Sequence, residues 1–260
     1  MKKVSLTVIF ILFFVYCSIS SAQELPYRLD DIIVTAERIA TPLGEAPANV
    51  SIITKEDFED SGARTIIDVF NNEPGLTTSN LLGSPKRAQI DIRGYGEAAP
   101  QNVLFLVDGR RINSIDLSGT DLSQIPIDMV ERVEIYRGPV SVLFGDNAVG
   151  GVVNIILRKG EDKPKVTLGA TAGNYELSQP KISVSGQQGI VSYFALATGL
   201  ETSGFRHNND LHSKDVLGNF VFDPSQNISI GLKAGFHEDK YGLPGALYKG
   251  SLRKGLVDQK

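Results

Sequence analysis

The chain has 260 residues, of which 42% are hydrophobic and 22% are charged, and its formal net charge is −4. This length allows one large domain or two ordinary ones, and the composition is close to the globular average, which excludes overall disorder. A mildly acidic chain without clusters of basic residues has no electrostatic footprint for nucleic acid, so a nucleic-acid partner is excluded as well.

Residues 1–22 have the pattern of a secretory signal peptide. Two lysines precede an apolar run over residues 4–16, and small residues occupy both cleavage-site positions before Gln23. The apolar run is too short, and too close to a cleavage signal, for a membrane anchor. Cys17, the only cysteine, follows a tyrosine rather than the small residue of a lipidation signal. We therefore expect an exported mature chain that has no cysteine and no disulfide.

A β-branched segment lies near the start of the expected mature chain, within residues 23–47. It consists of Asp31, Ile32, Ile33, Val34, Thr35 and Ala36. From the residues alone it is either an ordinary first strand or a detachable strand that pairs with the sheet edge of a partner through main-chain hydrogen bonds. Residues 41–47, with two prolines and one glycine, then predict an extended linker.

Residues 48–160 predict a compact α+β domain. Thr54 and Thr65 each have an aspartate three residues later, a spacing that predicts the N-caps of two short helices. A further helical turn is expected over residues 126–130, and Asp-Gly at 108–109 predicts a hairpin turn. Strands are expected where β-branched or alternating apolar residues occur, at 50–53, 89–93, 103–107, 131–137 and 152–157.

The segment over residues 131–159 carries the most specific pattern in the chain. A strand of alternating charged and apolar residues runs into Arg-Gly-Pro at 137–139, and Gly-Gly-Val-Val-Asn-Ile follows at 150–155. Any α+β domain contains strand–loop–strand pieces, which account for the local structure but not for these particular residues. The segment resembles the end of the plug domain of TonB-dependent outer-membrane receptors. Ile-Arg-Gly at 92–94 and the run at 121–126 match further plug motifs, the latter in members that carry vitamin B12.

The resemblance implies ligand-gated import across the outer membrane, driven by the proton-motive force. Residues 31–36 would be the TonB box, so the implied partners are TonB with its inner-membrane energising complex, a ferric siderophore or cobalamin, and outer-membrane lipid. The plug motifs are most similar to those of the vitamin B12 and siderophore receptors. Plug–barrel contacts are implied for Arg93, Arg132, Glu134 and Arg137. Ligand binding is implied at apical loops, with the candidates Ser84, Arg87, Tyr95, Gln101 and Asn113.

Residues 161–260 show alternation of apolar and polar residues, as at 166–172 and 228–237, with shorter and longer links between the runs. A half-buried soluble sheet also alternates, but the alternation of short and long links is typical of an outer-membrane barrel. We therefore predict antiparallel transmembrane β-strands with their apolar face toward lipid. The fourteen polar residues 201–214 are expected to form an outer loop.

Five or six such strands do not close a barrel around a plug, since plugged transporters need about 22 strands. An open sheet edge in lipid is not viable. The expected fold is thus an α+β plug followed by the strands of an incomplete outer-membrane β-barrel in a Gram-negative bacterium. We expect this chain to be a truncated product or gene fragment that does not transport alone.

Other functions have less support in the sequence. The residues at 94–99 fit a dinucleotide fingerprint, but Pro100 stands where the helix would begin. His207 and His212 fit a solvated loop better than a metal site, and no catalytic constellation is present, so we expect no enzyme, metal or cofactor. The main alternative is a secreted plug-like module that binds a ligand or partner without transport. Membrane fractionation separates the two.

Overall fold

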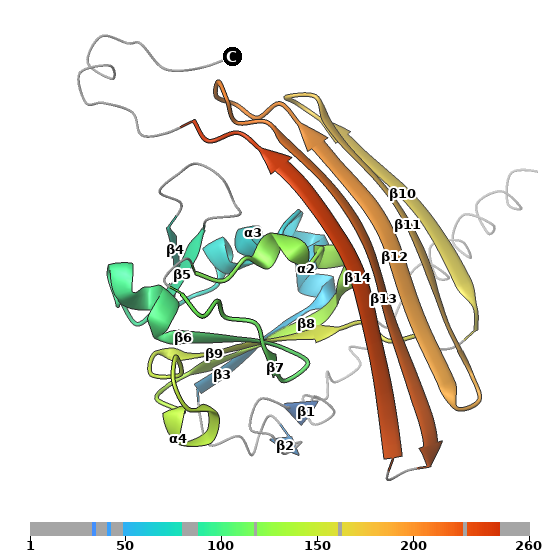
Figure 1. Ribbon diagram of the computed structural model, residues 1–260, viewed down its shortest axis with the longest axis horizontal. Helices are drawn as coiled ribbons and strands as arrows, with labels where there is room; N and C mark the ends of the chain where they lie inside the picture. Colours follow the sequence, from blue (N-terminus) through green and yellow to red (C-terminus); the bar gives the residue numbers. More distant parts are fainter. Residues whose placement is uncertain are drawn as a thin grey trace, which may run out of the picture.

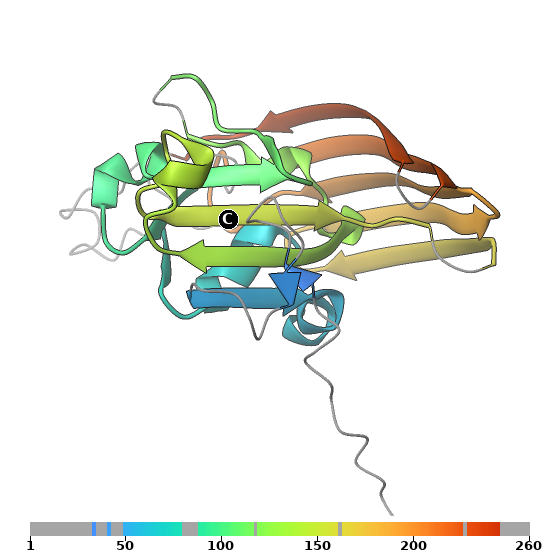
Figure 2. The ribbon, with the colours of Figure 1, turned by 90° about the horizontal axis from the view of Figure 1, so that it is seen from below.

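The computed structural model describes residues 49–79, 88–116, 119–160, 163–225 and 228–244, together with the backbone of residues 33–34 and 41–42. The expected signal peptide, the candidates Ser84 and Arg87, and most of the 31–36 segment lie outside the described residues. The described part contains an N-terminal α+β domain and a curved antiparallel sheet, which lie side by side (Figures 1 and 2).

A five-stranded mixed sheet forms the centre of the N-terminal domain. Its strands in spatial order are β3 (Asn49–Thr54), β8 (Val130–Arg137), β9 (Gly151–Leu157), β6 (Val103–Val107) and β7 (Arg110–Arg111). All neighbouring strands are antiparallel except β6 and β9, which run parallel. The β6–β7 turn places Asp108 and Gly109 at φ angles of 46° and 78°, which confirms the predicted hairpin.

Two helices, α2 (Lys55–Ser61) and α3 (Ile66–Asn72), pack on one face of this sheet (Figure 1). Both begin with the predicted capping box, in which the side chains of Thr54 and Thr65 accept hydrogen bonds from the backbone N–H groups of Asp57 and Asp68. The shorter elements are β4 (Leu76–Ser79), β5 (Gln89–Ile92), η4 (Gly96–Gln101), η5 (Leu122–Gln124), η6 (Ile127–Met129) and α4 (Ser141–Phe144).

The central sheet is buried on both faces. Val103, Phe105 and Val107 of β6 belong to the core cluster under the helices, whereas Leu104 and Leu106 belong to a second cluster on the opposite face. All five residues are buried, which explains why β6 reads as an unbroken apolar run rather than as an alternating one.

The curved sheet contains five strands that pair antiparallel in chain order. They are β10 (Lys165–Gly173), β11 (Leu177–Gln188), β12 (Val191–Thr202), β13 (Leu211–Ser225) and β14 (Ile228–Tyr241). Among the described residues the sheet is open, with β10 and β14 at its edges. The predicted fold class, an α+β domain followed by antiparallel strands that do not close a barrel, is confirmed.

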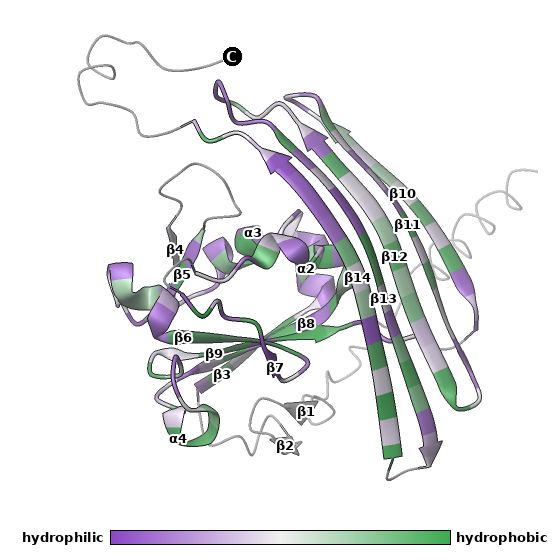
Figure 3. Ribbon diagram, viewed as in Figure 1, coloured by the Kyte–Doolittle hydropathy of each residue, from purple (hydrophilic) through white to green (hydrophobic). Residues whose placement is uncertain are grey.

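The link between β12 and β13 is shorter than expected. It covers only residues 203–210, because polar residues expected in the loop extend the two strands and pair across them, as Glu201 does with His212. Polar residues thus gather at one end of the strands, and β14 is hydrophilic toward that end and mixed below it (Figure 3). The part of the chain that the structure describes contains no helix that is both long and apolar enough to cross a membrane.

Candidate functional site

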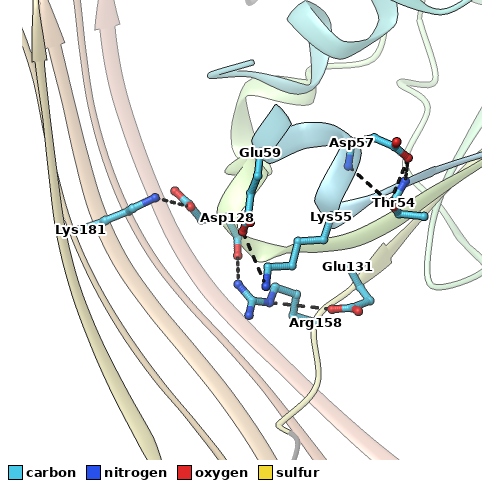
Figure 4. Close-up of polar contacts among 8 residues, drawn as sticks. All are labelled: Thr54, Lys55, Asp57, Glu59, Asp128, Glu131, Arg158 and Lys181. Atoms are coloured by element: carbon cyan, nitrogen blue, oxygen red, sulfur yellow. Dashed lines mark hydrogen bonds and ion pairs between the residues drawn. The ribbon is translucent and has the colours of Figure 1, made fainter. Parts of the chain in front are cut away.

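The N-terminal domain contacts the curved sheet through ion pairs that place an aspartate on the domain and a lysine on the sheet. The Nζ atom of Lys181, on β11, lies 2.6 Å from Oδ1 of Asp128, in η6 (Figure 4). Lys233, on β14, forms the second pair with Asp108 of the β6–β7 turn. The other oxygen of Asp108 accepts a hydrogen bond of 3.0 Å from the backbone N–H of Leu157, so this turn connects the sheet to β9.

Apolar and backbone contacts complete this interface. Phe194 and Leu196 of β12 are buried in the core cluster of the N-terminal domain. The guanidinium of Arg158 lies 4.6 Å from the ring centroid of Phe194, within the range of a cation–π contact. The side-chain amide of Asn219, on β13, donates a hydrogen bond of 2.9 Å to the carbonyl of Arg158. The chain segment that follows β9 is therefore held by two strands of the sheet.

Cavities lined mainly by polar and charged side chains lie between the domain and the sheet. One of about 500 Å³ is lined by both partners of the Asp108–Lys233 pair together with Arg132, Lys159 and Asn219. Another, of about 270 Å³, lies beside the Asp128–Lys181 pair. Because polar groups can exchange their partners for water, this polar part of the interface separates at lower cost than a dry apolar contact would.

The two faces of the curved sheet differ in chemistry. Lysines 181 and 233 and the buried residues Phe194 and Asn219 face the N-terminal domain. The alternate positions carry apolar side chains that are exposed, and Ile230 and Leu232 remain 58% and 64% accessible. Further exposed apolar side chains on the strands are those of Val166, Leu168, Ile182, Val184, Val216, Phe220, Phe222, Ile228 and Phe236. An apolar surface of this extent marks a contact with lipid or with another protein.

The four charged residues expected at a plug–barrel contact find their partners within the N-terminal domain. Arg132 pairs with Glu134 at 2.9 Å, and Glu134 is fully buried and also accepts a hydrogen bond from Asn154. Arg137 pairs with Glu73 at 2.5 Å, and Arg93 donates a hydrogen bond to the carbonyl of Arg137. Their contact with a barrel wall stays a prediction.

The residues that do join the domain to the sheet were not selected from the sequence. The available signal was a lysine on the polar face of an alternating strand, which Lys181 and Lys233 both satisfy. Their partners gave a weaker signal. Asp108 is an ordinary residue for an Asp-Gly turn, and Asp128 lies in a short helical turn.

Three of the candidates for ligand binding are described. Tyr95 is 37% exposed and Gln101 is exposed, so both side chains are accessible at η4. The side-chain amide of Asn113 instead bonds to the backbone of β6, accepting from the N–H of Phe105 and donating to the carbonyl of Val103. Asn113 therefore has a structural role in anchoring the segment that follows β7 to β6, and its contact with a ligand stays a prediction.

The backbone of the 31–36 segment forms part of a short hairpin. β1 (Ile33–Val34) pairs antiparallel with β2 (Thr41–Pro42), so that Val34 lies opposite Thr41. Ile33 and Val34 therefore take the extended conformation that strand addition to a partner requires.

One ion pair within the N-terminal domain changes the pKa of a carboxyl group. The Nη1 atom of Arg111, on β7, lies 2.6 Å from Oδ1 of Asp146 in the loop after α4. The hydrogen bond from Arg111 lowers the pKa of Asp146 below its ordinary value. Among the described residues, no group of three or more His, Cys, Asp or Glu side chains is placed to hold a metal ion.

Comparison with known proteins finds one match to the N-terminal domain and another to most of the chain. The family model of the TonB-dependent receptor plug domain matches residues 42–152. The vitamin B12 transporter BtuB of Vibrio vulnificus is 32% identical over 232 residues, which cover 89% of this chain and 37% of that protein. The chain thus spans little more than a third of the length of this relative.

Solved structures share the arrangement of domain and sheet. The ferripyoverdine receptor of the outer membrane of Pseudomonas aeruginosa superposes with a TM-score of 0.68 at 22% identity, covering 80% of this chain and 27% of that one. The siderophore receptor PirA of Acinetobacter baumannii gives a TM-score of 0.62 at 25% identity, covering 88% of this chain and 37% of that one. At these identities the likeness is one of fold.

Proposed function

Since the chain belongs to the TonB-dependent receptors, with a plug domain followed by strands that resemble the start of their barrel, we propose that it acts in ligand-gated import across the outer membrane. Members of this family are transporters and receptors rather than enzymes. The cleaved signal peptide at residues 1–22 and the plug boundaries at 48 and 160 are part of the same proposal.

One observation carries this proposal: the two faces of the curved sheet. Its inner face bonds to the plug through Lys181 and Lys233, and its outer face exposes apolar side chains such as Ile230. A barrel wall in an outer membrane requires this division, with a polar lumen and an apolar surface toward lipid. A soluble module would leave the apolar face in water, where it would favour aggregation.

The proposed cargo is a scarce nutrient of the cobalamin or ferric-siderophore class. Cobalamin is tested first, because the relative at 32% identity is a vitamin B12 transporter, whereas the siderophore receptors compared above match at 22% and 25%. Tyr95 and Gln101 at η4 are the accessible candidates for ligand contact. An exposed tyrosine is suited to this task, because its ring offers an apolar face and its hydroxyl a polar end.

The proposed energy source is TonB, which would pair with residues 31–36. Main-chain hydrogen bonds would give this contact its affinity. Because β1 already pairs with β2, a partner strand must replace that short hairpin, whose two residue pairs give it little stability of its own.

The proposal is tested by fractionation followed by uptake. We expect the chain, expressed in a Gram-negative cell, to enter the outer-membrane fraction with residues 1–22 removed. A full-barrel receptor that carries this plug is then assayed for TonB-dependent uptake of labelled cobalamin and of ferric siderophores. Uptake of either ligand supports import and identifies the cargo. Recovery of the chain from the soluble periplasm would instead support the secreted binding module.

A further inference from the structure

Strand β3 is the part of the plug sheet that a pull from residues 31–36 would reach first. It follows that segment along the chain, and in the described sheet it is an edge strand that pairs only with β8. The pairing starts with Asn49 opposite Arg137 and ends with Thr54 opposite Arg132. A force that enters at Asn49 therefore acts on the pair formed with Arg137 before it acts on any other pair of this ladder.

The side chain of Arg137 forms hydrogen bonds with two segments at that end of β3: with β3 itself and with the residues that follow α3. Its Nη1 atom donates to the Oγ of Ser51 at 2.6 Å and to the Oδ1 of Asn49 at 3.4 Å, and both acceptors lie on β3. Its Nη2 atom donates to the Oε1 of Glu73 at 2.5 Å and to the carbonyl of Pro74 at 2.8 Å, both just after α3. One guanidinium thus joins the edge strand to the segment that follows the helix.

The site of this guanidinium is partly closed to water. The side chains of Arg137 and Glu73 are only 13% and 16% exposed, so their ion pair is less screened than one on the surface. Gly75, with φ at +80°, allows the close approach, because a Cβ atom at this position would lie 3.2 Å from the Nε of Arg137. The fork of an arginine is needed here, since a lysine has one nitrogen and does not span both sets of acceptors.

We propose that Arg137 is a positioning residue that holds β3 on the plug and sets the load at which this strand detaches. The inference rests on the proposed function, in which TonB pulls on residues 31–36. Detachment would proceed from Asn49 toward Thr54, one residue pair at a time. It would be resisted beyond Thr54, where the capping box of α2 and its buried Phe58 fix the chain to the core.

Detachment of β3 alone would also open one side of the plug. Val50 and Ile52 pack against the second core cluster, which contains Tyr136 and Val152, so their removal exposes an apolar surface beside β8. The helices and the first core cluster would keep most of their contacts, because Ile53 is the one β3 residue among the buried members of that cluster. Release of the Arg137 contacts would thereby open the plug locally at β3 without unfolding the whole domain.

Hydrogen exchange of the full chain in detergent micelles tests whether Arg137 holds β3 on the plug, without TonB or ligand. We expect Glu73→Gln, which keeps the shape of the side chain and removes its charge, to increase the exchange rate of the β3 amides roughly tenfold. Arg137→Ala is expected to have a larger effect, and Arg137→Lys an intermediate one. Exchange in β6 and β9 should stay unchanged in Glu73→Gln. Arg110→Ala, at the opposite edge of the sheet, is the control for loss of a positive charge.

Single-molecule pulling from residue 31 adds the mechanical readout. The first rupture is expected to release the length of β3, and at a lower force in Glu73→Gln than in the native chain. Unchanged β3 exchange and rupture force in Glu73→Gln, or equal acceleration of exchange in β3, β6 and β9, would overturn the proposal. Both readouts are independent of transport. If a full-barrel receptor that carries this plug fails to import while the chain shows the expected exchange, only the proposed function is contradicted; the reverse result contradicts only the role of Arg137.

Discussion

At the residue scale, the plug sheet contains a charge that its surroundings must neutralise. Glu134 is fully buried in β8, where Arg132 lies 2.9 Å from Oε1 and the amide of Asn154 lies 3.3 Å from Oε2. The Oδ1 of Asn154 in turn accepts a hydrogen bond of 3.1 Å from the N–H of Gly109. A carboxylate taken out of water is strongly unfavourable unless such partners compensate it, so these residues depend on one another.

Replacement of one partner should therefore be costly. We expect Arg132→Ala to lower the free energy of unfolding by about 3–5 kcal/mol, because it leaves Glu134 buried without its cation. The exposed Arg110→Ala should stay within about 0.5 kcal/mol of the native chain. Urea unfolding of the chain in detergent, followed by far-ultraviolet circular dichroism, measures both. Equal effects of the two variants would contradict this role of Arg132.

The pair formed by Arg111 and Asp146 predicts a pH dependence. Because the hydrogen bond from Arg111 holds the pKa of Asp146 below 3.8, the carboxylate stabilises the folded chain above this pH. The contribution is lost as the pH falls through the lower pKa of the folded state. A carbon-13 NMR titration should give a midpoint for Asp146 below 3.8, and Arg111→Ala should raise it. An identical midpoint in the variant would show that the ion pair has no influence on this carboxyl group.

At the element scale, local signals in the sequence predicted local structure. The threonine–aspartate spacing at Thr54 and Thr65 predicted α2 and α3, and the runs at 103–107 and 131–137 predicted β6 and β8. These elements follow from capping and from side-chain periodicity, which depend on neighbours a few residues away. The short strand β4 was missed, because Leu76 is its only buried residue and gives no periodic pattern.

Contacts between distant elements were harder to predict. The parallel pairing of β6 with β9 joins segments about fifty residues apart, and nothing in either strand specifies the direction of its neighbour. Likewise, the charge of Arg137 was recognised but not its partners, since Glu73 lies 64 positions away. The plug–wall residues Asp108 and Asp128 were missed for the same reason, because each is an ordinary turn residue until the curved sheet places a lysine beside it.

The strand near the N-terminus gives a prediction at this scale. Val34→Pro removes one backbone donor and fixes φ near −65°, so it should prevent strand pairing at the centre of residues 31–36. Val34→Thr keeps the donor and the β-branched shape and should have little effect. In a full-barrel receptor that carries this plug, uptake should be lost only with proline, while ligand affinity stays unchanged. Normal uptake with Val34→Pro, or an equal loss of binding, would make the segment an ordinary structural strand.

At the scale of the whole molecule, the two sheets differ in the chemistry of their faces. The plug sheet is apolar on both faces and is covered on each, by α2 and α3 and by the cluster around Tyr136. The curved sheet has only one covered face, which contacts the plug through ion pairs, through the buried side chains of Phe194 and Leu196, and around cavities with polar lining. Its other face requires an apolar surrounding, and for this family that surrounding is the outer membrane.

A charge on the outer face should therefore be more costly than one on the inner face. Ile230→Arg, on the exposed apolar side of β14, is expected to destabilise a membrane-inserted full-barrel receptor that carries this chain by about 2–4 kcal/mol if it lies near the middle of the bilayer. Ser229→Arg, one residue away beside the cavity that contains Asp108 and Lys233, should have little effect. Unfolding in lipid vesicles compares the two variants. Equal tolerance would count against a lipid-facing surface.

The most direct test of this account is to measure whether each position along β14 is in contact with lipid when the protein is in a bilayer. In a cysteine-free full-barrel receptor that carries this chain, single cysteines at positions 228–236 can be spin-labelled one at a time, because the expected mature chain has no cysteine of its own. We predict that collisions with dissolved oxygen, which concentrates in lipid, peak at 228, 230, 232, 234 and 236 and fall at the odd positions, which face the plug. Accessibility to a water-soluble nickel complex at all positions, with no period of two, would contradict the assignment of this sheet as the wall of an outer-membrane receptor.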